Sequence, residues 1–315
     1  MGWGKVSGFY AGRAGRLWRA ARARTPGLPV PSALPSFPRR SLMKPTLLAD
    51  LTAVPRPVQA YPTLRESWSF VGWYLLAALV VGGGWYVLLR YTTSLPKIQL
   101  SITSSIAADV GLLAFLRWKA GARWPRWQLL GQARIWHFAL LPAVVVAAQV
   151  VLSLLDFLHL PDILTKDFGN LNQYFGVALL TRVMAMPVLE ELLFRGVILN
   201  GLLGSRRPWV AIGQSALLFG LIHFNPAQSL SAGLAGVLLG WLYYRTRSLG
   251  LCIGLHALNN GLILVLTHWA SAGWQHTDFL ELFPSAAYYA GAVVLSAAGL
   301  AAYVRGVACS TGTGQ

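Results

Sequence analysis

Eight runs of predominantly apolar residues follow one another through most of this chain of 315 residues. A helix needs about 17 to 25 such residues to cross roughly 30 Å of hydrocarbon, and most of the runs reach that length. The runs cover residues 68–89, 98–116, 135–155, 183–203, 209–224, 230–244, 250–269 and 285–304. The pattern predicts an all-α, polytopic membrane bundle of about eight transmembrane helices within residues 68–304, followed by a short tail at 305–315.

The composition agrees with a membrane protein, since 55% of the residues are hydrophobic and only 11% are charged. The formal net charge of +16 resembles that of a nucleic-acid-binding protein, but nine of the basic residues precede the first acidic residue, Asp50. The other basic residues gather between apolar runs, as membrane topology requires. We therefore expect no nucleic-acid partner. Two cysteines, Cys252 and Cys309, exclude a disulfide framework.

The connections between the runs predict the orientation in the membrane, because Lys and Arg accumulate on the cytoplasmic side. Basic residues follow the second, fourth, sixth and eighth runs, and acidic residues dominate most of the alternate connections. The cytoplasmic set is Arg117, Lys119, Arg123, Arg126, Arg134, Arg206, Arg207, Arg245, Arg247 and Arg305, and the outer acidic set is Asp156, Asp162, Asp167, Asp278 and Glu281. Both termini are expected in the cytoplasm.

The first 67 residues are Arg-rich and then Pro-rich, a composition that cannot bury a core. They are predicted to form a disordered extension. An acid-poor, Arg-rich start resembles an organellar transit peptide, but it also arises when a start codon is placed too far upstream. Met43 is the alternative start, and we favour that interpretation. The expected location is a bacterial inner membrane, with an organellar membrane as the alternative.

Two adjacent glutamates, Glu190 and Glu191, lie inside the fourth apolar run and are followed by Arg195. A charged side chain at the middle of a bilayer costs about 2.5 to 3.5 kcal/mol on insertion scales, so such a cluster indicates function. Glu191 and Arg195 are four residues apart and share one helix face, where they can form an ion pair. Glu190 then remains as a candidate general base. Pro187, one turn earlier, is expected to kink the helix.

Two further apolar runs carry imidazole and amide groups. His223 ends the fifth run, at a depth similar to that of Glu190 if each residue advances about 1.5 Å along its helix. His256 and Asn260 share one face of the seventh run, with Asn259 beside them. The same count places His256 about one turn nearer the cytoplasm than Glu190. These donors suit stabilisation of an oxyanion, although polar contacts between membrane helices explain them as well.

The ordered set Glu190, Glu191 and Arg195, then Phe219 and His223, then His256 and Asn260, on successive apolar helices, resembles the family of CAAX prenyl endopeptidases and bacteriocin-processing proteins. The resemblance covers roughly residues 170–265. It implies a membrane endopeptidase in which Glu190 activates water with the help of His223, and in which His256 and Asn260 stabilise the oxyanion. Glu191 with Arg195 would orient the site.

The resemblance implies a peptide or protein substrate within the membrane or a leader peptide, and a lipid bilayer as surroundings. It leaves the oligomeric state open. A metal-free mechanism is favoured because the zinc-binding pattern H-E-x-x-H is absent. If the enzyme needs a divalent metal such as zinc, Glu190, His223 and His256 are the candidate ligands.

Two other functions also fit these residues. A proton-coupled transporter uses carboxylates within the membrane, but it is expected to contain internal repeats, and we find no convincing one. A non-catalytic scaffold or immunity protein would keep the polar residues for structure and pack through small residues such as Gly236 and Gly240.

Overall fold

A computed structural model of the chain describes residues 61–163, 174–270 and 283–312. These residues all belong to one compact unit, Pro57–Gln315. The predicted N-terminal extension and Met43 therefore lie outside the described residues, except for residues 61–67. At that boundary the prediction of the first helix is corrected, because the helix begins at Leu64 rather than at residue 68. Thr63 caps it, since its side chain accepts a hydrogen bond from the Glu66 backbone while its own N–H donates to the Glu66 carboxylate.

The regular structure of the described part is helical, apart from an isolated β-bridge between Gln128 and Ser248. The elements that build the bundle are α3 (Leu64–Ala77), η2 (Ala78–Gly82), α4 (Gly83–Thr92), α5 (Lys97–Ala120), α6 (Ile135–Ala139), α7 (Leu141–Leu152), η4 (Ser153–Leu158), α9 (Phe175–Ala178), η5 (Leu179–Ala185), α10 (Met186–Glu191), η6 (Leu192–Leu199), α11 (Asn200–Leu203), α12 (Pro208–Leu221), α13 (Pro226–Thr246), α14 (Leu249–Ala270) and α15 (Ala286–Ser310). Every predicted apolar run is thus helical over most of its described length.

Five described helices are long and apolar enough to cross a membrane: Leu64–Thr92, Lys97–Arg123, Leu141–Leu158, Leu249–His268 and Ala286–Ser310. The predicted membrane helix bundle is confirmed in this coarser form, but the number of eight spans is not. The fourth run contains the charged cluster, α12 is only 14 residues long, and α13 carries several polar side chains. Length or polarity thus sets these three helices apart from the other five.

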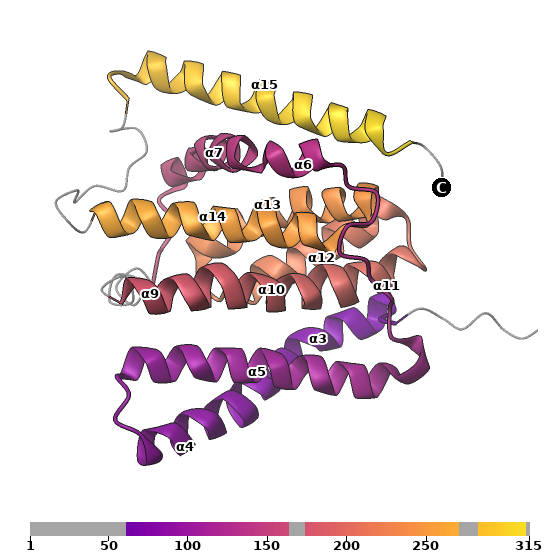
Figure 1. Cartoon of the computed structure of the whole chain (residues 1–315), viewed down its shortest axis with the longest axis vertical. Coiled ribbons are helices and arrows are strands. Elements are labelled where there is room, and N and C mark those ends of the chain that lie inside the picture. The colour runs from indigo at the N-terminus through magenta and orange to yellow at the C-terminus, as the bar shows by residue number, and fades with distance from the viewer. Residues whose placement is uncertain (1–60, 164–173, 271–282, 313–315) are drawn as a thin grey trace, which may run out of the picture. The chain divides into compact units, whose positions relative to one another are not determined.

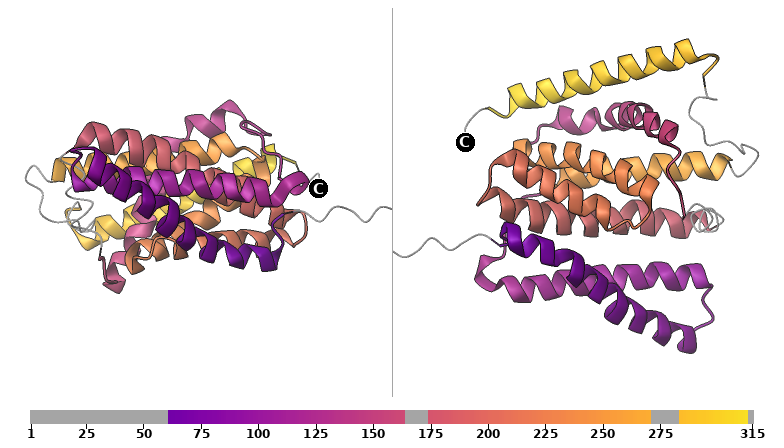
Figure 2. Two further views of the ribbon diagram at one scale, coloured as in Figure 1. Left: turned by 90° about the horizontal axis from the view of Figure 1, so that it is seen from below. Right: turned by 180° about the vertical axis from the view of Figure 1, so that it is seen from behind.

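The helices lie in layers that bring the fourth run to the centre (Figures 1 and 2). α15 packs on α7, α7 packs on α14, and α14 packs on the helix formed by α9 to α11. α5 and α3 lie against the other side of that helix, and α12 and α13 form a tight hairpin beside it. The helix that carries the charged cluster therefore has protein neighbours on several sides.

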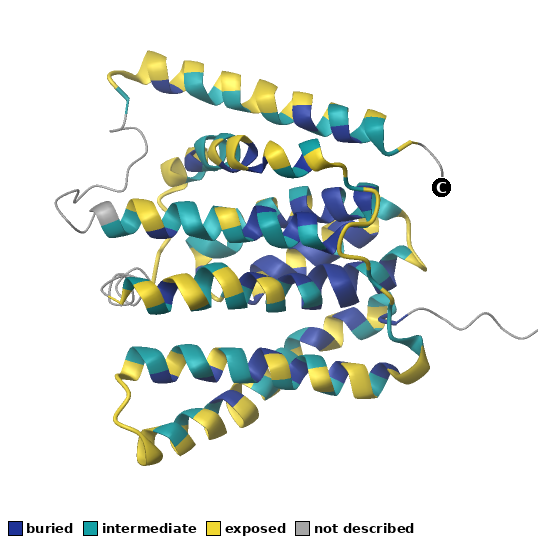
Figure 3. Ribbon diagram, in the orientation of Figure 1, coloured by how far each residue is buried: buried dark blue, intermediate teal, exposed yellow. Residues whose placement is uncertain are grey.

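The outer helices expose apolar side chains, and burial is concentrated in the central layers (Figure 3). Leu79 at the centre of the α3–α4 helix and Leu295 on α15 are each 75% exposed. Apolar exposure of this extent on long helices is expected where lipid, not water, surrounds the protein. The arrangement is thus that of an integral membrane protein.

The fourth run stays helical through Pro187, from α9 to α11, and the predicted kink at this proline stays a prediction. Pro187 lies near the start of α10, directly after the π-helical segment η5, and a second π-helical segment, η6, begins after Glu191. The wider turns of a π-helix accommodate residues that an α-helix would exclude, and they occur often at functional sites. The two glutamates therefore lie on a short α-helical stretch between two widened ones.

Close contact between α12 and α13 depends on a glycine. A Cβ atom added at Gly220 would lie 2.6 Å from the backbone oxygen of Ser229 and 3.3 Å from the Cα of Gly233. Gly213 is on the same helix, but a Cβ atom there would meet nothing within 4 Å. Gly220 thus permits the approach of backbone to backbone that places the end of α12 beside the site.

Gly220→Ala is expected to lower the free energy of unfolding by about 1 to 3 kcal/mol, because α12 and α13 must separate to admit the methyl group. Gly213→Ala should leave it unchanged or raise it by up to about 1 kcal/mol through helix propensity. Thermal unfolding of both variants in the same detergent checks this, and equal melting temperatures for the two would contradict it.

Candidate active site

The centre of the site is a buried ion pair on the fourth run. Arg195 Nη1 donates to Glu191 Oε1 at 2.6 Å, and both side chains are fully buried. The guanidinium also donates to the Gly236 carbonyl oxygen on α13 at 3.3 Å and lies 4.6 Å from the ring centroid of Phe219 on α12. The structure thus contains the i, i+4 pair that the sequence predicts, and it ties three helices together.

His256 on α14 lies between the two glutamates. Its Nδ1 donates to Glu191 Oε1 at 2.9 Å, while its Nε2 is 3.7 Å from Glu190 Oε2. The predicted offset of one helical turn between His256 and Glu190 stays a prediction, because two side chains of this length meet across such an offset. The ring also meets Phe219 edge-on, with 5.7 Å between centroids. Both ring nitrogens thus face carboxylates.

His223 follows the end of α12 and contacts the same aromatic ring. Its Nδ1 is 2.7 Å from the Phe219 carbonyl oxygen, and the two rings meet edge-on at 5.1 Å. A carbonyl oxygen only accepts hydrogen bonds, so Nδ1 carries the hydrogen and Nε2 of the neutral ring keeps its lone pair. Glu190 and His223 both line one cavity, so the structure brings these two predicted residues to a common wall.

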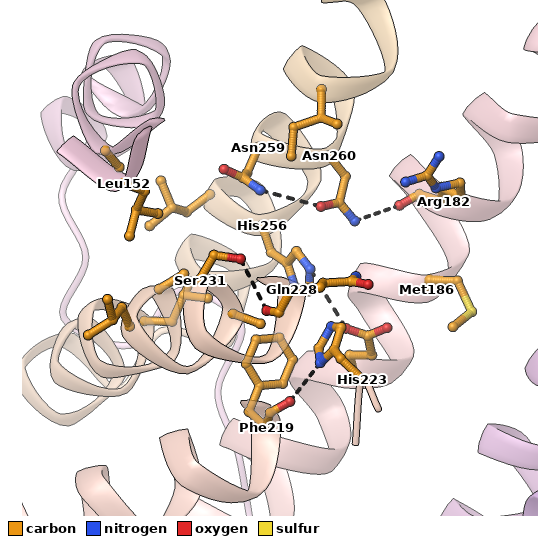
Figure 4. Close-up of a pocket in the computed structure, with 18 of the residues that line it drawn as sticks. Leu152, Arg182, Met186, Phe219, His223, Gln228, Ser231, His256, Asn259 and Asn260 are labelled. Atoms are coloured by element: carbon orange, nitrogen blue, oxygen red, sulfur yellow. Dashed lines mark hydrogen bonds and ion pairs between the residues drawn. The ribbon is translucent and has the colours of Figure 1, made fainter. Parts of the chain in front are cut away.

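The amides of α14 make hydrogen bonds to neighbouring helices, and the oxyanion role expected of Asn260 stays a prediction. Asn260 Nδ2 donates to the Arg182 carbonyl oxygen in η5 at 2.9 Å, and Asn259 Nδ2 is 3.5 Å from Asn260 Oδ1 (Figure 4). Gln149 of α7 donates to Asn259 Oδ1 at 2.5 Å. These bonds connect three helices, which fits the alternative interpretation of polar contacts between membrane helices. Asn259 and Asn260 nevertheless line the cavity too.

A cavity of about 700 Å³ lies against this polar wall. Glu190 reaches it with a side chain that is 14% exposed, beside His223 and His256. The rest of its lining is mostly apolar and comes from several helices, and includes Ile98, Ile102, Val145, Leu152, Leu234, Leu238 and Leu300. A volume of this size accommodates a peptide segment with its side chains or an acyl-like group.

The residues that would hold a metal do not form a ligand cluster. Within residues 61–163, 174–270 and 283–312, no three side chains of His, Cys, Asp or Glu are grouped as metal ligands. Nδ1 of His223 is bonded to a backbone oxygen and Nδ1 of His256 to Glu191, which leaves Nε2 of each ring as the nitrogen that a metal would use. Because Glu190, His223 and His256 are not grouped as ligands among the described residues, we derive no catalytic step from a metal ion.

Several polar residues near the site have no counterpart in the sequence prediction. Arg182, Gln149, Gln228 and Ser231 line the cavity. Asp109 in α5 is 2% exposed, and α5 packs on α10, which carries Glu190. The signal for Asp109 was present in the sequence, because a single acidic residue in an apolar run is itself a functional indication.

Comparison with family models finds a similarity over the segment that carries this site. Residues 172–262 match the family model of the type II CAAX prenyl endopeptidases, described as Rce1-like. The matched segment contains all six predicted site residues, and the resemblance inferred from the sequence is confirmed. Neither the curated proteins nor the solved structures include a match to the chain.

Arg195→Met is expected to cost about 3 to 5 kcal/mol of unfolding free energy, because Glu191 would remain buried without its cation. The matched control is Arg123→Met, which breaks a pair with Glu66 whose side chains are 32% and 29% exposed. That variant should cost less than about 1 kcal/mol. Unfolding of both proteins in one detergent checks the difference, and similar losses would show that the buried pair is not the stabilising element.

Proposed function

We propose that the chain is a CAAX-type intramembrane endopeptidase that hydrolyses a peptide bond with a water molecule activated by Glu190. The observation that carries this proposal is the position of Glu190: it lines an apolar cavity within a bundle of membrane helices, while the charge of its neighbour Glu191 is balanced by Arg195. The family match over residues 172–262 supports the same class of reaction.

In the proposed reaction Glu190 accepts a proton from water, and the water oxygen attacks the carbonyl carbon of the substrate. The carbonyl π electrons move to its oxygen, which gives a tetrahedral intermediate. Glu190 then returns the proton to the amide nitrogen, the C–N bond breaks, and a carboxylic acid and an amine are released. All atoms of the water are accounted for in the two products, so no further reactant is needed.

The neighbouring groups have distinct roles in this proposal. His223, which shares the cavity wall with Glu190, assists proton transfer through Nε2. His256 is held by Glu191 and fixes Glu190 through its other ring nitrogen, so its proposed role changes from oxyanion donor to positioning residue. The side-chain amides that line the cavity, Asn260 among them, then donate hydrogen bonds to the oxyanion.

The proposed substrate is a peptide or protein segment associated with the membrane, or a leader peptide, because the cavity lies among helices with exposed apolar surfaces. We further propose that all eight apolar helices cross the membrane with both termini in the cytoplasm, and that residues 170–265 form the protease core. A bacterial inner membrane remains the proposed location, with an organellar membrane as the alternative.

Glu190→Gln is expected to lower cleavage by at least about 100-fold, because general base catalysis contributes a factor of about 10² to 10⁴. The assay uses purified full-length protein and a library of membrane peptides, with product detection by mass spectrometry. Glu66→Gln removes a carboxylate outside the cavity and should leave the cleavage rate unchanged. Cleavage should also survive a strong divalent-metal chelator.

Three outcomes contradict this account in different ways. Loss of cleavage in chelator with recovery on adding zinc would make Glu190, His223 and His256 metal ligands. Cleavage that persists in folded Glu190→Gln would place the base elsewhere. The absence of any cleavage by folded wild-type protein would favour the scaffold or the proton-coupled transporter. A measurement of proton flux in vesicles distinguishes these two, because only the transporter produces one.

A further inference from the structure

Asp109 is a buried carboxyl group for which the proposed reaction has no use. It lies midway along the membrane helix Lys97–Arg123, is 2% exposed, and its Oδ2 is buried without a hydrogen-bond partner among the described residues. An ionised carboxylate is strongly disfavoured when it is buried in this way and one of its oxygens has no donor among the described residues. The group is therefore expected either to carry a proton or to have a function for which its unfavourable burial is retained.

The helix that carries Asp109 places it beside the candidate active site. Ser105, one turn earlier on the same face of α5, lines the cavity together with Glu190, and α5 packs on α10. Tyr74 from α3, which also packs on α5, lines the same cavity as Glu190. Asp109 thus lies just behind the cavity wall and within electrostatic reach of the proposed base.

The other titratable groups on α5 and on the elements packed against it are Arg65, Glu66, Tyr86, Arg90, Tyr91, Lys97, Arg117, Lys119, Arg123 and Glu191. Several of these are engaged elsewhere. Glu66 pairs with Arg123, and Glu191 pairs with Arg195. The Lys119 ammonium lies 4.5 Å from the centroid of the Trp73 ring. The nearby base Glu190 is acidic itself, so it offers Asp109 repulsion and no balancing charge.

Two like charges in one region of low dielectric do not ionise together readily. Glu190 has the better environment for a negative charge, because it reaches the cavity and lies 3.7 Å from His256. Asp109 has neither advantage. Of the two carboxyl groups, Asp109 therefore has the surroundings that favour a proton.

We infer that Asp109 is a protonated positioning residue that keeps Glu190 as the single uncompensated negative charge at the cavity, and that ionisation of Asp109 sets the alkaline limit of activity. A second negative charge behind the wall would oppose the oxyanion that forms during attack on the carbonyl. The role in the pH limit rests on the proposed function, whereas the protonated state of Asp109 does not.

The protonation state of Asp109 is measured by infrared spectroscopy of the full-length protein in lipid nanodiscs at pH 7, with the spectra of wild type and of the variants compared. A carbonyl-stretching band of a protonated carboxylic acid should appear in wild type and in Glu190→Gln, and it should be absent in Asp109→Asn. This readout needs no substrate, so it remains informative if the chain proves not to be a peptidase. A wild-type spectrum without such a band overturns the inference.

The kinetic test compares kcat/KM between pH 5 and pH 10 for a peptide that wild type cleaves and Glu190→Gln does not. Asp109→Asn should match wild type within about twofold at pH 7, and its alkaline limb should move up by about one pH unit or more. Ser104→Ala, a buried change on the same helix, should keep the wild-type limb. Tyr74→Phe should also keep it if the carboxyl rather than the phenol is responsible.

An alkaline limb that is identical in wild type and Asp109→Asn overturns the inference, as does a wild type without such a limb. So does a tenfold or greater loss at pH 7 in a folded Asp109→Asn, because it would mean that the charge on Asp109 is required. If Asp109→Asn fails to fold, Asp109→Ala provides a smaller neutral side chain for the same comparison. Cleavage that depends on Glu190 but not on Asp109 would leave the proposed function intact.

Discussion

The Glu191–Arg195 ion pair is the interaction on which the rest of this site depends. A charged pair inside a membrane bundle needs charge balance and hydrogen bonds, and here the pair is fully buried, with Glu191 Oε2 and Arg195 Nε left without a hydrogen-bond partner among the described residues. Arg195 reaches the Gly236 carbonyl on α13 and the face of Phe219 on α12, while Glu191 accepts from His256 on α14. The contacts of one ion pair thus join four helices.

The ion pair also determines the surroundings of Glu190. Glu190 lies on the same short α-helical stretch but lines the cavity. One ring nitrogen of His256 faces Glu190 because the other is bonded to Glu191. A carboxylate beside an apolar cavity is then held without being neutralised by the arginine. The two neighbouring glutamates face different surroundings because successive residues of a helix are rotated by about 100°. One is therefore part of a buried ion pair, and the other lines the cavity.

Local periodicity made part of this site predictable from the sequence. Glu191 and Arg195 are four residues apart on one helix, so their pairing required no knowledge of the tertiary structure. The position of His256 was not predictable in the same way, because it depends on where α14 starts relative to α10. The contact of Asn260 with the Arg182 carbonyl depends likewise on how two helices pack.

The same distinction holds for the fold. The apolar runs predict the helices themselves, because a long apolar segment has few alternatives in a membrane. They do not predict how many helices cross it, since polar residues on α13 and the charges of the fourth run reflect contacts with other helices. The π-helical segments around Pro187 and the place of Asp109 behind the cavity wall also arise from tertiary packing.

The central claim is that Glu190 activates water and does not itself attack the substrate. A single turnover in ¹⁸O-labelled water, with enzyme in excess over a cleaved peptide, tests this most directly by mass spectrometry of product and enzyme. The account predicts one ¹⁸O atom in the new carboxylate of the product and none in the Glu190 side chain. Label in Glu190 after one turnover would show a covalent acyl intermediate on that carboxylate and would contradict the account.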